Sequence, residues 1–482
     1  MNRPVVLAVA IASLGGEAHA QYWRPLGLGT VGVTEIQTLY GDSISGRLLA
    51  GGTFLHIRNV SDTVLAYGQA AWNGMRWDSL ATRIQPFQGG EMVGQTHWYL
   101  RFQGRLFACG FFAFLTSDSI WNTNFARLDE SSQRWEELEC INSVQSELTT
   151  LVPKVPDTTL YATGWKGSLC GMPESCVFRY DGSAFLSWAP FDLIPPDNNN
   201  YVGTIFDYKG KTYLTGSVRD PVEPGYATFL RWTGTAWEHV PGWNTLSPIK
   251  EILIHNDTLY VGGAFRFATG GPGDLIASFD GENWDDMGGG LSYPPVPNGA
   301  AVLDLEWWQG QLLASGRISQ AGDADCTGIA KWDGHRWCSF AGVLQHASGI
   351  ASRITDMAIW RDSLYICGDF STSDGEPVRQ VAQWIGGEAT GECSTVGVLE
   401  ADHRPLDLVV TPTPVDGAWM VRFPHPGPWQ VATYNTAGQQ VGAWYHAASP
   451  LLLDLSTQPP GMYLVQVSTP GDDVRHAKVV RP

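Results

Sequence analysis

Paired carboxylates are the residues in this sequence that could most directly do chemistry. Asp285 precedes Asp286, and Asp323 lies two residues before Asp325. Two carboxylates are the catalytic groups of most glycosidases, and oxygen-rich loops such as AGDAD (321–325) and TSDGEP (372–377) also suit Ca²⁺. However, the loops lack EF-hand spacing and have the composition of turns. We therefore favour turn and solvent roles, and we expect no catalytic residue, metal ligand or cofactor.

Motifs of other hydrolases are absent from the sequence. There is no Gly-x-Ser-x-Gly and no His-Glu-x-x-His. The stretch SFDGENW (278–284) lacks one residue of the Ser-x-Asp-x-Gly-x-x-Trp motif of sialidases. A hairpin turn explains it equally well, so an enzyme remains only an alternative.

Three aromatic residues are candidates for ligand binding. Trp165, Tyr201 and Trp307 fall outside the repeated aromatic positions described below, whereas Trp308 falls within one. Aromatic rings offer large rigid surfaces with little conformational entropy to lose, so they suit stacking on sugars or proteins. We predict ligand binding by these three residues.

Composition and charge limit the partners. The 482 residues carry 30 Lys and Arg against 48 Asp and Glu, a net charge of −18. This acidic balance argues against nucleic acid and against anionic membranes. Residues 1–20 have the basic start, apolar segment and Ala-x-Ala end of a signal peptide, with cleavage between Ala20 and Gln21. No other stretch has the length of a transmembrane segment.

Eight cysteines in an exported protein suggest disulfides. No pair shows the Cys-x-x-Cys spacing of zinc sites. Cys170 and Cys176 enclose only five residues and are expected to pair locally. Candidate pairings within one repeat are Cys109 with Cys140, Cys326 with Cys338, and Cys367 with Cys393, and the sequence leaves the connectivity open.

One pattern of about 50 residues occurs seven times. An apolar run such as LYVGG ends on a glycine, an aromatic residue follows, and a second aromatic comes five residues later in most units. The last glycines are Gly52, Gly110, Gly164, Gly216, Gly263, Gly316 and Gly368. The tryptophans at or near the second aromatic position are Trp23, Trp77, Trp135, Trp237, Trp284 and Trp337.

Each unit is predicted to form four antiparallel strands, with an Asp-Gly or Asn-Gly two-residue turn before the last. The seventh unit lacks its tryptophan strand, and YWRPLGLGTVG (22–32) matches the missing piece. We therefore predict that the segment around Trp23 pairs with the strand containing Trp384. The tryptophans and glycines are interpreted as packing between neighbouring sheets, since glycine lets a facing backbone approach.

These repeats resemble kelch-like propellers. The resemblance implies an all-β fold, a seven-bladed β-propeller over residues 21–390 closed by the N-terminal strand. Galactose oxidase has such a ring but needs two Tyr and two His on copper, and the histidines here are scattered.

The C-terminal segment has a different pattern. Residues 391–406 resemble a linker, and 407–482 predict a small β-sandwich. The second segment resembles the C-terminal sorting domain of type IX secretion cargo. The matching residues are Pro412, Pro414, Tyr434, Ala437-Gly438, Leu453-Asp454-Leu455-Ser456, Pro460-Gly461-Met462-Tyr463 and Lys478-Val479-Val480. The resemblance implies the type IX machinery as partner and a secreted or outer-surface location reached through the periplasm. An ordinary immunoglobulin-like module is the alternative.

The predicted function is non-catalytic binding of a glycan or protein through one face of the ring. The long loops 187–203, 265–274 and 287–300 are expected on that face, where a rigid scaffold can hold binding residues. The alternatives are an extracellular enzyme acting on polysaccharide from the same face, and an architectural surface protein without a specific ligand.

Overall fold

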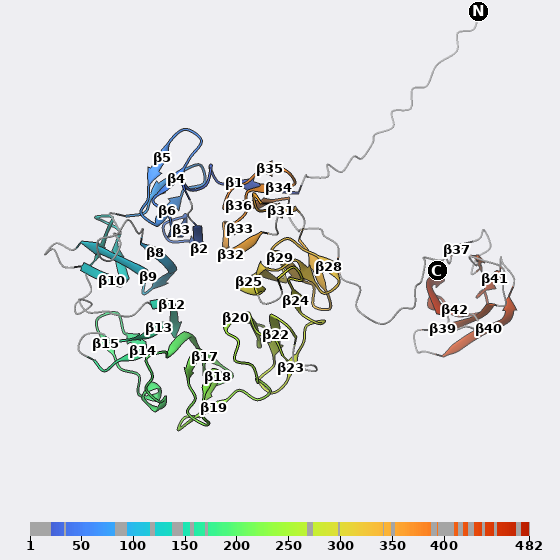
Figure 1. Cartoon of the computed structure of the whole chain (residues 1–482). Helices are drawn as coiled ribbons and strands as arrows, with labels where there is room; N and C mark the ends of the chain where they lie inside the picture. The colour runs from blue at the N-terminus through green and yellow to red at the C-terminus, as the bar shows by residue number, and fades with distance from the viewer. Residues whose placement is uncertain are drawn as a thin grey trace, which may run out of the picture. The chain divides into compact units, whose positions relative to one another are not determined.

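The computed structural model describes the chain from Gln21 to Arg481, apart from internal segments. These segments are residues 33–34, 82–93, 116–120, 137–147, 155–158, 169–171, 268–272, 297–298, 341, 349–351, 387–392, 394–408, 413–417, 423–428, 436–438, 448–450 and 469–473. The predicted signal peptide and most of the predicted linker therefore lie outside the described residues. The chain divides into two compact units, residues 1–396 and 397–482 (Figure 1). Within the described part, no helix has the length and apolar character needed to cross a membrane.

The first unit is built from antiparallel sheets, and its described residues contain no α-helix, which confirms the predicted all-β class. Seven groups of four strands form the frame of the described part. They are β2(Glu35–Asp42), β3(Arg47–Thr53), β6(Gln69–Trp72), β7(Trp77–Ser79); β8(Gln95–Phe102), β9(Arg105–Leu115), β10(Trp121–Asp129), β11(Arg134–Glu136); β12(Leu148–Lys154), β13(Thr159–Gly167), β14(Ser175–Tyr180), β15(Phe185–Leu186); β16(Tyr201–Tyr208), β17(Lys211–Arg219), β18(Tyr226–Trp232), β19(Trp237–His239); β20(Ile249–His255), β21(Thr258–Gly263), β22(Ile276–Phe279), β23(Trp284–Asp285); β25(Ala301–Trp308), β26(Gln311–Arg317), β29(Ile329–Trp332), β30(Trp337–Ser339); and β32(Arg353–Trp360), β33(Ser363–Asp369), β36(Val381–Ile385), β1(Tyr22–Pro25).

Short elements decorate the connections between these strands. They are β4(His56–Arg58) with β5(Thr63–Leu65), β24(Leu291–Ser292) with β27(Gln320–Ala321) and β28(Ala324–Asp325), β31(Leu344–Gln345) with β34(Thr372–Ser373) and β35(Glu376–Pro377), and the 3₁₀ helix η1(Ala189–Leu193).

The N-terminal strand completes the last sheet. Strand β1 pairs antiparallel with β36, and Trp23 lies opposite Trp384, as predicted. The two rings pack edge to face with centroids 5.1 Å apart, and Trp23 is buried. The sheet that contains β32 and β33 therefore also contains the first strand of this unit, β1, and its last strand, β36.

The sheets follow one another around a ring (Figure 1). Each sheet presents its first strand to the next sheet's first strand, so that β2, β8, β12, β16, β20, β25 and β32 contact one another in turn, and β32 contacts β2. The connections from second to third strand and from fourth strand to the next sheet share one end of the ring. We call this end the loop face.

The repeated tryptophans join neighbouring sheets. The indole N–H of Trp337 donates to the carbonyl of Met287, which follows the last strand of the preceding sheet, at 2.7 Å. Three other tryptophans also donate their indole N–H to a backbone carbonyl of the preceding sheet. These bonds run from Trp77 to Leu26, from Trp237 to Pro190 and from Trp284 to Pro241. Because an indole buries roughly 200 Å², these contacts are a substantial part of the apolar seal between sheets.

The glycine interpretation needs correction. A Cβ on Gly316 would lie 2.1 Å from the carbonyl oxygen of Ala301, which belongs to the same sheet, at a β-bulge between Val302 and Asp304. Glycine is needed there for the bulge, at φ +158°, and not for a neighbouring sheet. The equivalent clash with the same sheet recurs at Gly52, Gly110, Gly216, Gly263 and Gly368.

Other glycines make the predicted contact between sheets. A Cβ on Gly342 would lie 2.8 Å from the ring of Trp23, and one on Gly242 would lie 2.9 Å from the ring of Trp284. Both follow the last strand of the sheet before the tryptophan. A glycine therefore does face the tryptophan ring of the next sheet, as predicted. However, this glycine is not one of the seven repeated glycines named in the sequence analysis.

The turns before the tryptophan strands are also longer than predicted. Trp332 pairs directly with Trp337, so four residues connect the strands instead of two. Asp333 closes the turn, because its Oδ1 accepts the backbone N–H groups of His335 and Arg336, both at 2.9 Å.

The second unit contains two antiparallel sheets around an apolar core. Their strands are β37(Val409–Pro412), β38(Ala418–Arg422) and β41(Leu451–Asp454), and β40(Gln440–Ala447), β39(Trp429–Asn435), β42(Gly461–Ser468) and β43(Val474–Arg481). Trp419 and Leu453 from the first sheet pack with Val431, Tyr463 and Val465 from the second. Thr413, Pro414 and Ala437-Gly438 of the sorting-domain match lie outside the described residues.

Candidate functional site

Two of the three predicted binding residues come together on the loop face. Trp165, near the end of β13, pairs with Tyr201 at the start of β16, and this pair joins two of the seven sheets. Their ring centroids are 5.0 Å apart with an interplanar angle of 43°. Trp165 is 44% exposed, which is unusual for the largest apolar side chain. The pair forms an aromatic platform open to solvent.

A buried asparagine holds the backbone beneath this platform. Asn200 is 2% exposed and precedes Tyr201. Its Oδ1 accepts the N–H of Arg219 at 2.7 Å, and its Nδ2 donates to the carbonyl of Pro195 at 3.0 Å. Its own carbonyl accepts the N–H of Lys166 at 3.1 Å. One side chain and one carbonyl therefore tie β13, β17 and the connection 187–200 together, so the platform is preorganised.

Charged groups lie on the residues that flank the aromatic pair in β13, β17 and the connection 187–200. Lys166 Nζ lies 2.7 Å from Glu174 and donates to Asn198 at 3.0 Å. The Arg219 guanidinium lies over the ring of Tyr226, 5.6 Å from its centroid. A hydrogen bond from the backbone N–H of Asn199 lowers the pKa of Asp197, so this carboxyl is ionised at neutral pH. The platform thus has donors and acceptors at its rim.

The third predicted residue does not join the platform. Trp307 lies near the end of β25, at the end of the ring opposite to the loop face, and is half-buried. Its ring stacks on His255 of β20 with centroids 3.6 Å apart and an interplanar angle of 15°. Trp307 therefore packs between two sheets instead of offering a free ring.

The loop face also carries exposed apolar side chains outside the platform. They lie on connections of consecutive sheets, where no fold requirement places them. They are Leu193, Val222, Leu246 and Val296, which are 54, 60, 74 and 52% exposed. Each of these side chains offers exposed apolar surface at this end of the ring.

Two of the carboxylates singled out in the sequence hold turns. Asp285 Oδ1 accepts the N–H of Met287 at 2.8 Å, and Asp286 Oδ1 accepts the N–H of Gly288 at 3.1 Å. These two bonds support the turn roles expected for Asp285 and Asp286. In TSDGEP, Asp374 Oδ1 instead accepts the N–H of Val343 at 2.9 Å, so it joins the connection after β33 to the connection after β30.

A different set of carboxylates gathers where the first strands meet. Met357 N–H donates both to Asp304 Oδ2 at 2.7 Å and to Asp356 Oδ1 at 2.9 Å, so the two carboxyl groups lie against each other. The second oxygen of Asp356 accepts the N–H of Leu39 at 2.6 Å. Asp304 and Asp356 therefore join β25, β32 and β2, because they satisfy N–H groups that no neighbouring strand pairs.

Burial raises the pKa values of these carboxyl groups, and each side chain keeps part of its surface accessible. Burial raises the pKa of Asp356 to about 7. Burial, followed by the charge of Asp356, raises the pKa of Asp304 well above its ordinary value. Burial and then Asp304 do the same for Glu251. The motifs in the sequence do not single out these three residues, although all three lie twelve residues before a repeated glycine.

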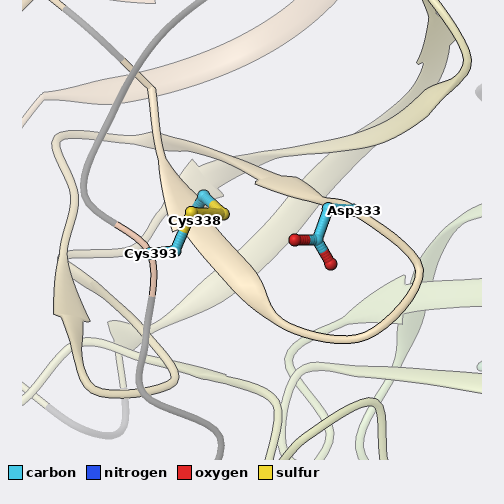
Figure 2. A group of neighbouring side chains, drawn as sticks. All are labelled: Asp333, Cys338 and Cys393. Atoms are coloured by element: carbon cyan, nitrogen blue, oxygen red, sulfur yellow. A yellow bond between two sulfur atoms is a disulfide. The ribbon is translucent and has the colours of Figure 1, made fainter. Parts of the chain in front are cut away.

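One disulfide replaces two of the predicted pairings. Cys338 of β30 bonds to Cys393, so the pairings of Cys326 with Cys338 and of Cys367 with Cys393 are wrong (Figure 2). The physical reason is that Cys393 lies beside the edge strand β30, where it forms an isolated β-bridge with Cys338. Cys326 and Cys367 are buried thiols. Cys140 and Cys170 lie outside the described residues, so the pairings of Cys109 with Cys140 and of Cys170 with Cys176 stay predictions.

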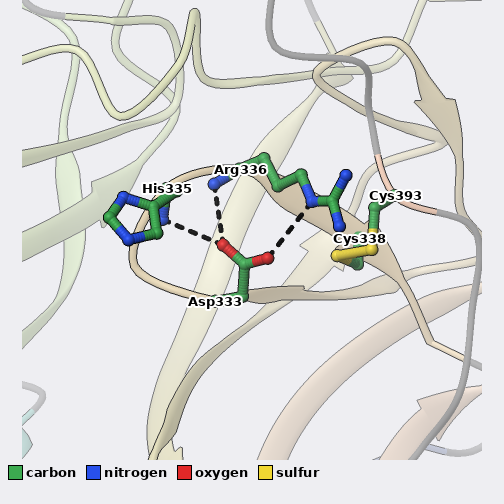
Figure 3. Close-up of a disulfide and its surroundings, with 5 residues drawn as sticks. All are labelled: Asp333, His335, Arg336, Cys338 and Cys393. Atoms are coloured by element: carbon green, nitrogen blue, oxygen red, sulfur yellow. Dashed lines mark hydrogen bonds and ion pairs between the residues drawn. A yellow bond between two sulfur atoms is a disulfide. The ribbon is translucent and has the colours of Figure 1, made fainter. Parts of the chain in front are cut away.

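The neighbourhood of this disulfide offers no metal site. Figure 3 shows Asp333 beside Cys338 and Cys393, with its carboxylate turned toward Arg336. Arg336 Nε lies 3.3 Å from Asp333 Oδ2. Both sulfur atoms are bonded to each other in the disulfide, and the Asp333 carboxylate accepts hydrogen bonds from its own turn. We therefore interpret this group as structural.

Comparisons with known proteins give only weak likenesses. No protein-family model and no curated protein sequence matches the chain. The extracellular domain of the putative one component system BT4673 from B. thetaiotaomicron has a TM-score of 0.45 and 9% identity, over 96% of this chain and 58% of that one. PorZ, a surface component of the type-IX secretion system of Porphyromonas gingivalis, has a TM-score of 0.37 and 8% identity, over 95% and 85%. The chain thus spans about 58% of the length of the first, and likenesses this weak establish no shared function.

Proposed function

We propose that this chain is a secreted or cell-surface, non-catalytic seven-bladed β-propeller that binds a carbohydrate at the Trp165–Tyr201 platform. The propeller is supported by the succession of contacts between first strands and by the pairing of β1 with β36. The seven groups of strands are its blades, and the tryptophans seal the wedges between them.

The exposed ring of Trp165 carries the proposal. A tryptophan that served only the fold would be buried, as Trp77 and Trp337 are. Trp165 instead stands 44% exposed on a backbone that Asn200 fixes from below. A preorganised ring loses little entropy on binding, so its surface contributes efficiently to affinity.

Carbohydrate fits the platform better than an extended apolar ligand. Sugar rings offer C–H faces to an aromatic surface and hydroxyl groups to its rim. Here the rim provides Lys166, Asp197 and Arg219, which supply donors and an acceptor within one patch. A few polar groups around an apolar surface are the usual composition of a small-ligand site.

The second unit is proposed to be a type IX sorting domain. Its support is the resemblance at Tyr434, Asp454 and Pro460-Gly461-Met462-Tyr463, together with two sheets around one core. Mass spectrometry of the secreted protein tests this role. Recovery of peptides from 407–482 on the mature surface form would contradict it.

A glycan array with the full chain tests the binding function. We expect Trp165→Ala and Tyr201→Ala each to lower affinity about tenfold or more, since stacking and rim contacts are lost. Trp307→Ala is the matched control, because it removes the same side chain from a stack at the opposite end. Absence of any glycan bound, or binding unchanged in both platform variants, would refute the proposal. Binding to a surface protein that depends on Leu246 would assign the loop face to a protein partner instead.

A further inference from the structure

Three potential metal ligands meet at the loop-face end of the sheet that contains β17 and β19. Asp220 directly follows β17, Glu223 lies in the connection to β18, and His239 is the last residue of β19. One ligand atom from each lies within 4.8 Å of the other two. The sequence separates these residues by up to nineteen positions, and no motif marks them.

The imidazole of His239 lies between the two carboxylates. Its Nε2 is 2.7 Å from Asp220 Oδ2, and its Nδ1 is 3.6 Å from Glu223 Oε1. The 2.7 Å contact is a hydrogen bond, and a metal held between these two atoms by bonds of about 2.0–2.2 Å would widen it to about 3 to 4 Å. The Glu223 side chain is 66% exposed, so it can rotate toward the ring nitrogen that faces Asp220.

The backbone aims the Asp220 carboxylate at the imidazole. Its Oδ1 accepts the N–H groups of Val222 at 2.8 Å and Glu223 at 3.2 Å, which leaves Oδ2 directed at His239. The carboxylate is therefore oriented before a ligand arrives, as hydrogen bonds from neighbouring groups orient the ligands of metal sites.

The charge of the cluster favours a cation. Within the part of the chain that the structure describes, the ion pairs of Asp220 and Glu223 are made with His239 and not with a lysine or arginine. With a neutral imidazole the cluster carries about two negative charges. The His239 side chain is 36% exposed, so an ion can enter from solvent.

We propose that Asp220, Glu223 and His239 bind Zn²⁺, which would tie the connection 220–225 to the outer strand of this sheet. One imidazole nitrogen and two carboxylate oxygens form a common zinc ligand set, with a fourth position for water. Ca²⁺ and Mg²⁺ prefer ligand sets made of oxygen alone. This proposal is independent of carbohydrate binding, because none of its ligands belongs to the platform.

The test measures Zn²⁺ binding to the full chain by isothermal titration calorimetry, with the bound metal counted after dialysis. We expect one Zn²⁺ per chain, and at least a tenfold weaker Kd in both His239→Ala and Glu223→Gln. The glutamate is exposed, so Glu223→Gln keeps the fold even if His239→Ala does not. The matched control is His346→Ala, because His346 lies 3.3 Å from Asp369 and these two residues belong to no group of three potential ligands among the described residues.

The Kd values of the three variants decide between support and refutation. A Kd unchanged in His346→Ala and weakened in the two cluster variants supports the site. No saturable binding of ZnCl₂, or binding that His239→Ala and Glu223→Gln leave unchanged, overturns the proposal.

Discussion

Replacing Asp356 by asparagine should change how stability depends on pH. In the wild type, burial raises the pKa of Asp356 to about 7 from an ordinary value of 3.8. The folded state therefore favours the protonated acid. Its contribution is fully present below about pH 4 and is lost as pH rises through about 7, because folding must then bury a charge. Over this whole pH range the free energy of unfolding falls by about 4 kcal/mol because of Asp356. About 3 kcal/mol of that decrease occurs between pH 5 and pH 8.

Asparagine can take the place of the protonated acid. Its oxygen can accept the Leu39 N–H, and Met357 N–H keeps Asp304 Oδ2 as acceptor at 2.7 Å. The asparagine amide cannot accept the second bond from Met357 N–H, which Asp356 Oδ1 accepts at 2.9 Å. The cost of that lost bond does not depend on pH, so it cancels when the variant is compared with the wild type at two pH values. The variant cannot ionise at this position. We therefore compare the free energy of unfolding of Asp356→Asn with that of the wild type at each pH. We expect this difference, variant minus wild type, to be about 3 kcal/mol larger at pH 8 than at pH 5.

Urea unfolding of the full chain, followed by tryptophan emission at several pH values, measures this difference. Asp181→Asn is the control. Hydrogen bonds, first from the N–H of Ala184, lower the pKa of Asp181 to about 2, so its contribution changes only in acid. A difference between wild type and Asp356→Asn that stays constant from pH 5 to pH 8 would refute the raised pKa of Asp356.

Three further perturbations test the packing and the platform. Gly342→Ala should lower the free energy of unfolding by about 1–3 kcal/mol, because its Cβ would lie 2.8 Å from the Trp23 ring. Gly334→Ala, with open space around its Cβ, should cost less in the same urea titration, and equal losses would contradict the packing argument. Cys393→Ser should lower the free energy of unfolding by about 2–4 kcal/mol in non-reducing buffer, and no change would mean that the bridge does not form. Trp165→Ala should leave the melting temperature within about 2 °C of the wild type in scanning calorimetry, since its ring is 44% exposed. A large drop would show that the ring serves the fold.

The sequence alone determined the features that recur locally or by repetition. The all-β class follows from short apolar runs between glycine-rich turns. The pairing of the Trp23 segment with the strand of Trp384 follows because a missing repeat element must come from elsewhere in the chain. The exposed partners Trp165 and Tyr201 could be singled out because they fell outside every repeated position, although their contact could not.

Only the tertiary structure decided which residues meet across sheets. Gly316 proved to serve a bulge in its own sheet, and Cys338 bonds to Cys393 because the two residues form a β-bridge at the edge of β30. Asp304 and Asp356 became a buried acid pair because two neighbouring first strands bring them to the same N–H group. Repetition in a sequence records what each sheet needs for itself, whereas the pKa of a carboxyl or the partner of a thiol depends on distances between sheets. Those distances exist only once the ring has closed.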